Sequence, residues 1–130
     1  MHNAAQSLIV VEDEPIISIM IEELVQELGW TVDGSAQSEA AAFDLLGTCS
    51  PQLALLDINL GLTTSLAVAA SCRDRHIPIV FMTGYTASDI PDQCGDDPVL
   101  AKPFSPDALD RALRRALQKN SEAFPPLTPN

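Results

Sequence analysis

The chain has 130 residues, which is close to the usual size of one domain and long enough to bury a core without disulfides or a structural metal. Hydrophobic residues make up 46% of it, too many for a disordered protein. Eighteen acidic residues against seven basic ones give a net charge of −11, which argues against nucleic acid and anionic membrane surfaces as direct partners.

The amino-acid pattern predicts alternating strands and helices. In chain order we predict a strand over Leu8–Val11, a helix over Pro15–Leu28, a strand over Trp30–Val32, a helix over Ser38–Leu46, a strand over Leu53–Leu56, a helix over Leu66–Cys72, strands over Ile79–Met82 and Val99–Leu100, and a helix over Pro106–Gln118. The Trp30 and Val99 strands are the weaker ones and belong at sheet edges. The alternation indicates an α/β fold with a mostly parallel sheet covered on both faces.

Two segments depart from this alternation. Thr86–Pro98 contains three turn-forming residues, Pro91, Gly95 and Pro98, and four aspartates, so the fourth helix should be short, frayed or absent. The last eleven residues contain three prolines. We therefore predict a folded domain over residues 7–119 and a disordered tail over residues 120–130.

Cysteine and histidine usage points to a reduced compartment. Cys49, Cys72 and Cys94 are widely spaced and odd in number, and the two histidines stand alone, so neither a disulfide framework nor a zinc site is expected. The amino terminus has no signal-peptide pattern, and no apolar run is long enough to span a bilayer. We expect buried thiols in a soluble, cytoplasmic protein.

The first helix has two kinds of apolar residue. At 100° per residue, one buried face collects Ile17, Met20, Ile21, Leu24 and Leu28. Ile16 and Ile19 fall outside that face, beside polar residues, and exposed apolar side chains of this kind often contact a partner. Scattered surface isoleucines are also ordinary in proteins without any such role.

Charged and polar side chains follow the predicted strands at their carboxyl ends, where parallel sheets bind ligands. Glu12 and Asp13 follow the first strand, Asp57 the third, Thr83 the fourth and Lys102 the fifth. Three carboxylates so close together would repel one another unless a cation lay among them, and hard oxygen ligands suit Mg²⁺. A carboxylate held in this way can accept a phosphoryl group, whose charge an ammonium and a hydroxyl would compensate. Taken singly, each residue also fits a helix cap, a turn or a surface position.

Four short motifs, in order, resemble the receiver domain of two-component response regulators. They are Val-Val-Glu-Asp-Glu-Pro at 10–15, Leu-Leu-Asp-Ile-Asn-Leu at 55–60, Phe-Met-Thr-Gly-Tyr at 81–85 and Ala-Lys-Pro-Phe at 101–104. The resemblance covers Leu8 to about Gln118, and the third motif is similar to the signature of the FAT GUY subgroup. It implies a doubly wound, flavodoxin-like fold with five strands in the order 2-1-3-4-5.

The resemblance also assigns roles. Asp57 would be the phosphoacceptor, Asp13 would bind Mg²⁺ directly, and Glu12 would bind it mainly through water. Asn59 would offer the ion its backbone carbonyl. The resemblance further implies that Thr83 hydrogen-bonds the phosphoryl group, that Lys102 pairs with it, and that the Lys102–Pro103 bond is cis.

One position departs from the family pattern. Receivers carry an aromatic residue three positions before the lysine, and this chain has Val99 there. We hypothesise that Tyr85 substitutes for it and that phosphorylation orders the Tyr85–Pro98 segment. A loop tyrosine without any switching role remains the alternative.

The resemblance implies protein partners. A sensor histidine kinase or histidine phosphotransfer protein would dock on Ile16, Ile19, Pro103 and Phe104. We expect a single-domain response regulator without an output domain, which would signal through an unknown downstream protein or act as a phosphate sink. We expect a monomer, since the irregular segment before Val99 weakens the usual dimer face. We also expect a signalling protein that is not an enzyme.

Two other functions fit parts of the sequence. An aspartyl-phosphate phosphatase would need an acidic residue two positions after its nucleophile, where this chain has Asn59, and a cap domain for which no residues remain. A phosphorylation-independent interaction module would have no need of the acidic cluster, Thr83 and Lys102.

Overall fold

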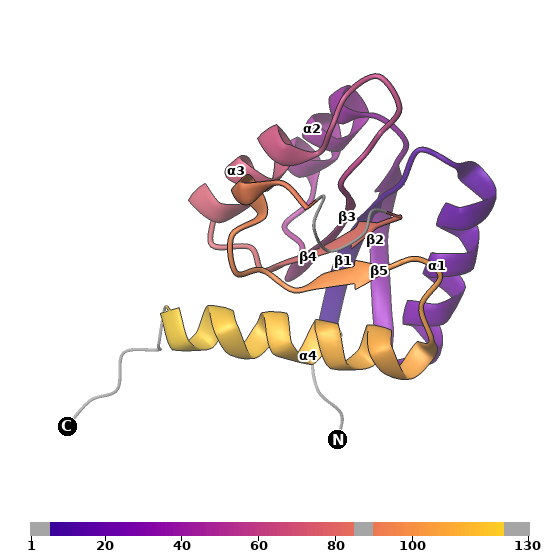
Figure 1. Cartoon of the computed structure of the whole chain (residues 1–130), viewed down its shortest axis with the longest axis vertical. Coiled ribbons are helices and arrows are strands. Elements are labelled where there is room, and N and C mark those ends of the chain that lie inside the picture. Colours follow the sequence, from indigo (N-terminus) through magenta and orange to yellow (C-terminus); the bar gives the residue numbers. More distant parts are fainter. Residues whose placement is uncertain (1–5, 85–89, 124–130) are drawn as a thin grey trace.

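A five-stranded parallel sheet with helices on both faces forms the molecule (Figure 1). The computed structural model describes residues 6–84 and 90–123, with side chains through Lys119. The elements are β1 (Gln6–Val11), α1 (Pro15–Glu27), β2 (Trp30–Ala36), α2 (Glu39–Thr48), β3 (Leu53–Asp57), α3 (Leu66–Asp74), β4 (Ile79–Thr83), the 3₁₀ helix η2 (Asp92–Cys94), β5 (Val99–Ala101) and α4 (Pro106–Ala123).

The strand order β2-β1-β3-β4-β5 confirms the predicted flavodoxin-like topology, and all four strand pairings are parallel. Every residue of β3 and β4 is buried, as expected for central strands covered on both faces. The two strands with the weaker sequence signal, β2 and β5, lie at the edges. The sheet therefore follows from the distribution of apolar runs along the chain.

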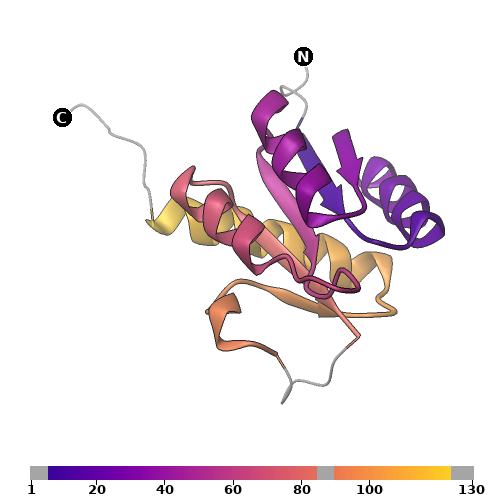
Figure 2. The same ribbon diagram turned by 90° about the horizontal axis from the view of Figure 1, so that it is seen from above.

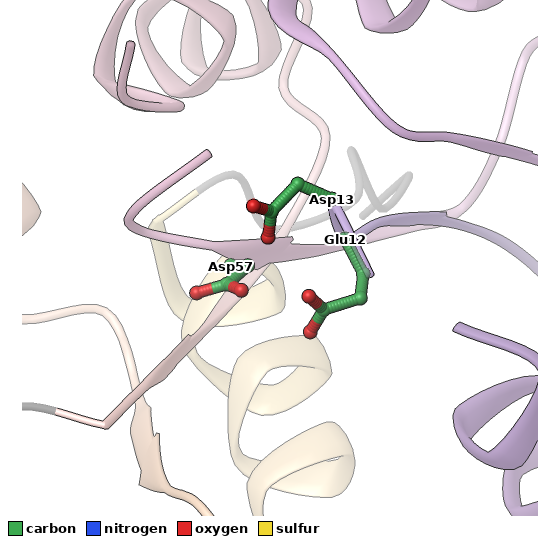
Figure 3. A group of neighbouring side chains, drawn as sticks. All are labelled: Glu12, Asp13 and Asp57. Atoms are coloured by element: carbon green, nitrogen blue, oxygen red, sulfur yellow. The ribbon is translucent and has the colours of Figure 1, made fainter. Parts of the chain in front are cut away.

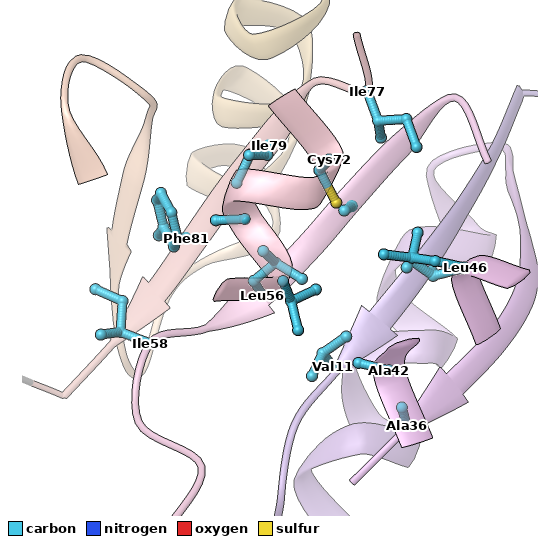
Figure 4. Packing of buried hydrophobic residues seen from close by; sticks show 14 of the residues in the cluster. Val11, Ala36, Ala42, Leu46, Leu56, Ile58, Cys72, Ile77, Ile79 and Phe81 are labelled. Atoms are coloured by element: carbon cyan, nitrogen blue, oxygen red, sulfur yellow. The ribbon is translucent and has the colours of Figure 1, made fainter. Parts of the chain in front are cut away.

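The core has one apolar layer on each face of the sheet. On one face α2 and α3 contribute Ala42, Leu46, Val68, Ala69 and Cys72, which pack against β-strand residues such as Leu56 and Phe81 (Figure 4). On the other face α1 and α4 pack against the alternate residues of the same strands, through Ile21, Val25, Leu109, Leu113 and Ala116. Figure 2 shows the two helix pairs on opposite sides of the sheet.

Local signals start the helices where the sequence predicts. Pro15 occupies the first turn of α1, where its missing N–H costs nothing. The Ser38 hydroxyl caps α2 by accepting the Ala41 N–H at 3.1 Å, and the Ser105 hydroxyl accepts the Ala108 N–H at 3.0 Å before α4. Within residues 6–84 and 90–123, no helix is both long and apolar enough to cross a bilayer.

Several boundary and burial predictions need correction, and one of them is the second strand, which runs to Ala36 rather than Val32. Met20, predicted to be buried, is 54% exposed, whereas Val25 is buried. The buried face of α1 centres on Ile21 and Val25, and Met20 lies about 100° from Ile21, at the edge of that face. The last helix ends at Ala123 rather than Gln118, because no helix-breaking residue occurs before Pro125. Residues 124–130 of the predicted tail lie outside the described part of the chain, so the disordered tail stays a prediction.

The connection from β4 to β5 contains no α-helix in its described residues, 90–98, and the three-residue η2 confirms the predicted short fourth helix. Arg73 of α3 holds this segment. Its guanidinium donates to the Gln93 carbonyl at 2.9 Å and to Asp97 Oδ2 at 2.9 Å. Lys119 of α4 reaches Asp97 Oδ1 at 3.3 Å. Residues 93–97 are thus tied to two helices by side-chain contacts.

The three cysteines are free thiols. Cys72 and Cys94 are buried as predicted, but Cys49, at the end of α2, is only partly so. Burial raises the pKa of the Cys72 thiol to about 11, so it stays protonated and unreactive at neutral pH.

Candidate functional site

The predicted site residues meet at the carboxyl edge of the sheet. Asp57 and Thr83 are the last residues of β3 and β4, and Lys102 directly follows β5. Parallel pairing aligns these ends, because Asp57 lies opposite Met82 and Thr83 opposite Ala101. The Lys102 N–H donates to the Thr83 carbonyl at 2.7 Å, which extends the ladder one step beyond the strand. The backbone thus carries all three side chains to one place.

Three carboxylates lie together at this edge. Glu12, Asp13 and Asp57 each offer an oxygen within 4.8 Å of the other two (Figure 3). Glu12 and Asp57 are buried, whereas Asp13 is partly open to solvent. Asp13 is therefore the carboxylate that an ion arriving from water reaches with the least loss of its hydration.

Lys102 joins two of these carboxylates. Its Nζ lies 3.0 Å from Glu12 Oε1 and 2.9 Å from Asp57 Oδ2. Burial acts to lower the pKa of Lys102, but the hydrogen bonds and charges of Asp57 and Glu12 outweigh it, so the pKa is raised above its usual value. The side chain is thus an ammonium throughout the neutral pH range.

Glu12 can be buried because both of its oxygens have partners. Oε1 accepts from Lys102, and Oε2 accepts the backbone N–H of Glu14 at 3.2 Å. A buried carboxylate without such partners would be strongly destabilising. With both oxygens engaged, Glu12 acts at the site mainly through its charge.

The donor set fits a divalent cation. Three carboxylates against one ammonium leave two negative charges at a partly open site. Carboxylate oxygens are the ligands that Mg²⁺ prefers, and the partly exposed Asp13 keeps the cluster in contact with water, which Mg²⁺ retains in its coordination sphere. Glu12, Asp13 and Asp57 are the residues that would hold the ion, and a bound ion would polarise an incoming phosphoryl oxygen.

The loop after β3 closes over the same carboxylates. Asn59 Oδ1 accepts the Gly61 N–H at 3.1 Å, and Asn59 forms an antiparallel bridge with Thr64. Gly61 has φ +85, and a Cβ there would lie 3.6 Å from Asp13 Oδ2. Glycine is favoured by that backbone conformation, which brings the loop against the cluster. Gly61 was not predicted from the sequence, where the only signal was a glycine soon after Asp57. A role for the Asn59 carbonyl in binding the ion stays a prediction.

The two predicted switch residues have different outcomes. Thr83 is buried at the end of β4, and its carbonyl accepts the Lys102 N–H. Tyr85 lies outside the described residues. The proposed relay through Tyr85 therefore stays a hypothesis.

The predicted docking residues lie beside the site, on α1 and the loop after β5. Ile16 is 74% exposed and Ile19 is 56% exposed. Pro103 and Phe104 line a hollow of about 370 Å³ whose other wall is α1, including the exposed Met20. Ile16 and Ile19 are not part of its lining. The Lys102–Pro103 bond is cis, as the resemblance implied.

We predict that Lys102→Met destabilises the metal-free protein by about 1–3 kcal/mol, because Glu12 and Asp57 lose the ammonium between them. Adding Mg²⁺ should restore more stability to this variant than to the wild type. Urea unfolding followed by the fluorescence of the buried Trp30 measures both effects.

Lys119→Met is the matched control, since it also removes an ammonium near a carboxylate, at the opposite end of the sheet. Its response to Mg²⁺ should equal that of the wild type. An equal response in the Lys102 variant would contradict the account of the site given above.

Comparison with known proteins yields many relatives of one kind. The phyllosphere-induced regulator PhyR of Methylorubrum extorquens is 31% identical to this chain over 120 residues. The alignment covers 87% of this chain and 44% of PhyR. The transcriptional regulatory protein PdtaR of Mycobacterium tuberculosis is 26% identical over 119 residues, covering 88% of this chain and 58% of that protein. The chain thus spans about half the length of these curated relatives.

Solved structures are also similar to this chain. The solution structure of SdrG from Sphingomonas melonis Fr1 superimposes with a TM-score of 0.79 at 34% identity, covering 89% of this chain and 99% of SdrG. The response regulator PhyR from Brucella abortus gives a TM-score of 0.77 at 29% identity, covering 94% of this chain and 51% of that one. Residues 8–114 match the family described as the response regulator receiver domain. The chain therefore belongs to the response regulator receiver domain family, a signalling module of two-component systems.

Proposed function

We propose that this protein is a single-domain response regulator that accepts a phosphoryl group on Asp57 with the help of Mg²⁺. The donor would be the phosphohistidine of a sensor kinase or of a histidine phosphotransfer protein. The observation that carries the proposal is the position of Asp57, whose Oδ2 lies 2.9 Å from the Lys102 ammonium within a cluster of three carboxylates. A buried carboxylate held in this way is a pre-positioned nucleophile.

The transfer exchanges one bond for another. A carboxylate oxygen of Asp57 attacks phosphorus, a P–O bond forms, and the P–N bond to the donor imidazole breaks. Lys102 then turns from the Asp57 carboxylate to the phosphoryl oxygens, and the Thr83 hydroxyl donates to another of them. Thr83 is the last residue of β4 and Lys102 directly follows β5. Both strands end beside Asp57, so these two side chains need to move little.

The proposed output is a change in protein contacts. The relatives PhyR and PdtaR are named as regulators, and this chain matches only 44% and 58% of their lengths. We propose that this chain acts on a separate downstream protein, or drains phosphoryl groups from its kinase, as a monomer without catalytic turnover. Its free cysteines suit the reducing cytoplasm.

Phosphorylation by a small donor tests the acceptor. Incubation with phosphoramidate and Mg²⁺ should add one phosphoryl group per chain, as read by intact-mass spectrometry, and Asp57→Asn should abolish it because the amide is a poor nucleophile. Asp44→Asn, which removes an exposed aspartate on α2, should leave labelling unchanged. Undiminished labelling of the Asp57 variant would refute the assignment, and turnover of phosphomonoesters would point instead to a phosphatase.

Phosphorylation should order the segment between β4 and β5, because Val99 rules out the usual aromatic relay. Since Arg73 and Lys119 already fix residues 93–97, we expect the change to occur before Asp92. Amide exchange with and without fluoroberyllate should show added protection there. Identical exchange in both states would reject the switch.

Docking should depend on the exposed apolar residues of α1. Ile16→Glu or Ile19→Glu should slow phosphotransfer from a phosphorylated kinase at least about fivefold, because burying a charge in the contact is unfavourable. Labelling by phosphoramidate should be unchanged. Phe43→Glu, at an exposed apolar residue of α2, is the control. Equal transfer rates for all three variants would exclude this docking face.

A further inference from the structure

The exposed face of α4 carries an unusual concentration of positive charge. Four of the seven basic residues of a chain with net charge −11 lie on this helix. Arg111, Arg114 and Arg115 are all exposed, and their spacing places them on one face of the helix. We call these three residues the arginine stripe.

The arginine stripe has little acidic compensation. Arg114 pairs with Asp110 one turn earlier, at 2.9 Å, but its side chain is mostly exposed and the pair is weak. Arg111 and Arg115 form no ion pair with any side chain in the described part of the chain. Two guanidinium groups, each able to bind a carboxylate through two hydrogen bonds, thus face solvent.

A cavity lies at the end of this stripe. It measures about 480 Å³ and has apolar walls that include Ile77, Ile79 and Ala116. The basic side chains at its border, Arg73 and Lys119, are already paired, since Asp97 contacts both, so the cavity itself offers an apolar site and the positive charge comes from the stripe. An adjoining hollow of about 520 Å³, lined by Asp96, Arg115, Gln118 and Lys119, connects it to the stripe, since the two share Asp96 and Lys119. The cavity is at the amino end of β4, and a three-residue 3₁₀ helix forms its rim at Cys94.

We propose that the arginine stripe and this cavity together bind an acidic segment of a partner protein, which inserts one apolar side chain into the cavity. Charge complementarity selects the acidic partner, because the guanidinium groups of Arg111 and Arg115 match carboxylates. Nucleic acid fits less well, since a chain of charge −11 repels a phosphate backbone. A second copy of this chain is the less favoured partner, because it carries the same arginine stripe and two such stripes facing each other would repel.

This inference goes beyond the proposed function and does not depend on it. The cavity lies at the amino end of β4, whereas Asp57 is at the carboxyl end of β3, so the unphosphorylated protein should already bind.

Nuclear magnetic resonance of the ¹⁵N-labelled full chain tests the proposal. The probe is a synthetic peptide of glutamates with one central leucine. Two comparison peptides replace the leucine by serine or every glutamate by lysine. The acidic peptide should shift amide signals of residues 111–119 and 93–97, and its affinity should fall at least about tenfold between low and high salt. The serine peptide should bind more weakly, because the cavity stays unfilled.

Two double variants separate charge from fold. Arg111→Gln with Arg115→Gln should weaken binding of the acidic peptide about tenfold, and Arg111→Lys with Arg115→Lys should weaken it less, because the charge remains while the two-hydrogen-bond geometry is lost. Phosphoramidate labelling of Asp57 should be normal in both, so that failure of one proposal does not imply failure of the other.

The opposite results would overturn the proposal. The proposal would be wrong if the acidic and basic peptides bound equally well, if the acidic peptide shifted only amide signals of α1, or if it did not bind at low salt. Concentration-dependent self-association that the glutamine variant abolishes would assign the surface to a second copy. Tighter binding of a single-stranded RNA oligonucleotide than of the acidic peptide would assign it to nucleic acid.

Discussion

The contact of Lys102 with Glu12 and Asp57 is the interaction on which the site depends. Two buried carboxylates next to a third would destabilise the fold if nothing compensated their charge. The ammonium lies within 3.0 Å of one oxygen of each, and a backbone N–H satisfies the remaining oxygen of Glu12. The negative charge that is left over at Asp13 and Asp57 is what would favour a divalent cation at this site. Stability and chemistry at this edge therefore have the same electrostatic origin.

The buried strands make that contact possible. β3 and β4 are enclosed on both faces, so their carboxyl ends have fixed positions, and parallel register brings Asp57, Thr83 and Lys102 to one edge. The loops that follow carry the functional groups on a rigid base. Gly61 supplies the positive φ of +85 that one of these loops adopts beside Asp13. The domain thus combines a stiff sheet with a polar edge whose groups need only small movements.

The other end of the sheet has a different character. There, the alternation of strands and helices would place an α-helix between β4 and β5, but the described residues form only a 3₁₀ helix, which Arg73 contacts. A cavity lies next to it, lined by residues of α3 and α4. Most of the basic residues lie near this end, on α4 and at the end of α3. Asp96 and Asp97 line the same cavity, and Asp97 pairs with both Arg73 and Lys119. The charges at this end are therefore mixed, and Arg111 and Arg115 are the guanidinium groups that no ion pair among the described residues compensates.

The sequence by itself determined the element order, the edge positions of β2 and β5, the weak fourth helix, and which polar residues stand at the carboxyl ends of the strands. These follow from apolar runs, from Pro and Gly, and from side-chain types at strand ends, all of which act over a few residues. Only the tertiary structure decided that Lys102 contacts Glu12, that Met20 is exposed, that Gly61 lies against Asp13, and that Arg73 holds residues 93–97. Each of these depends on how elements distant in the chain pack together. Local pattern does not encode that packing, as the 90 residues between Glu12 and Lys102 illustrate.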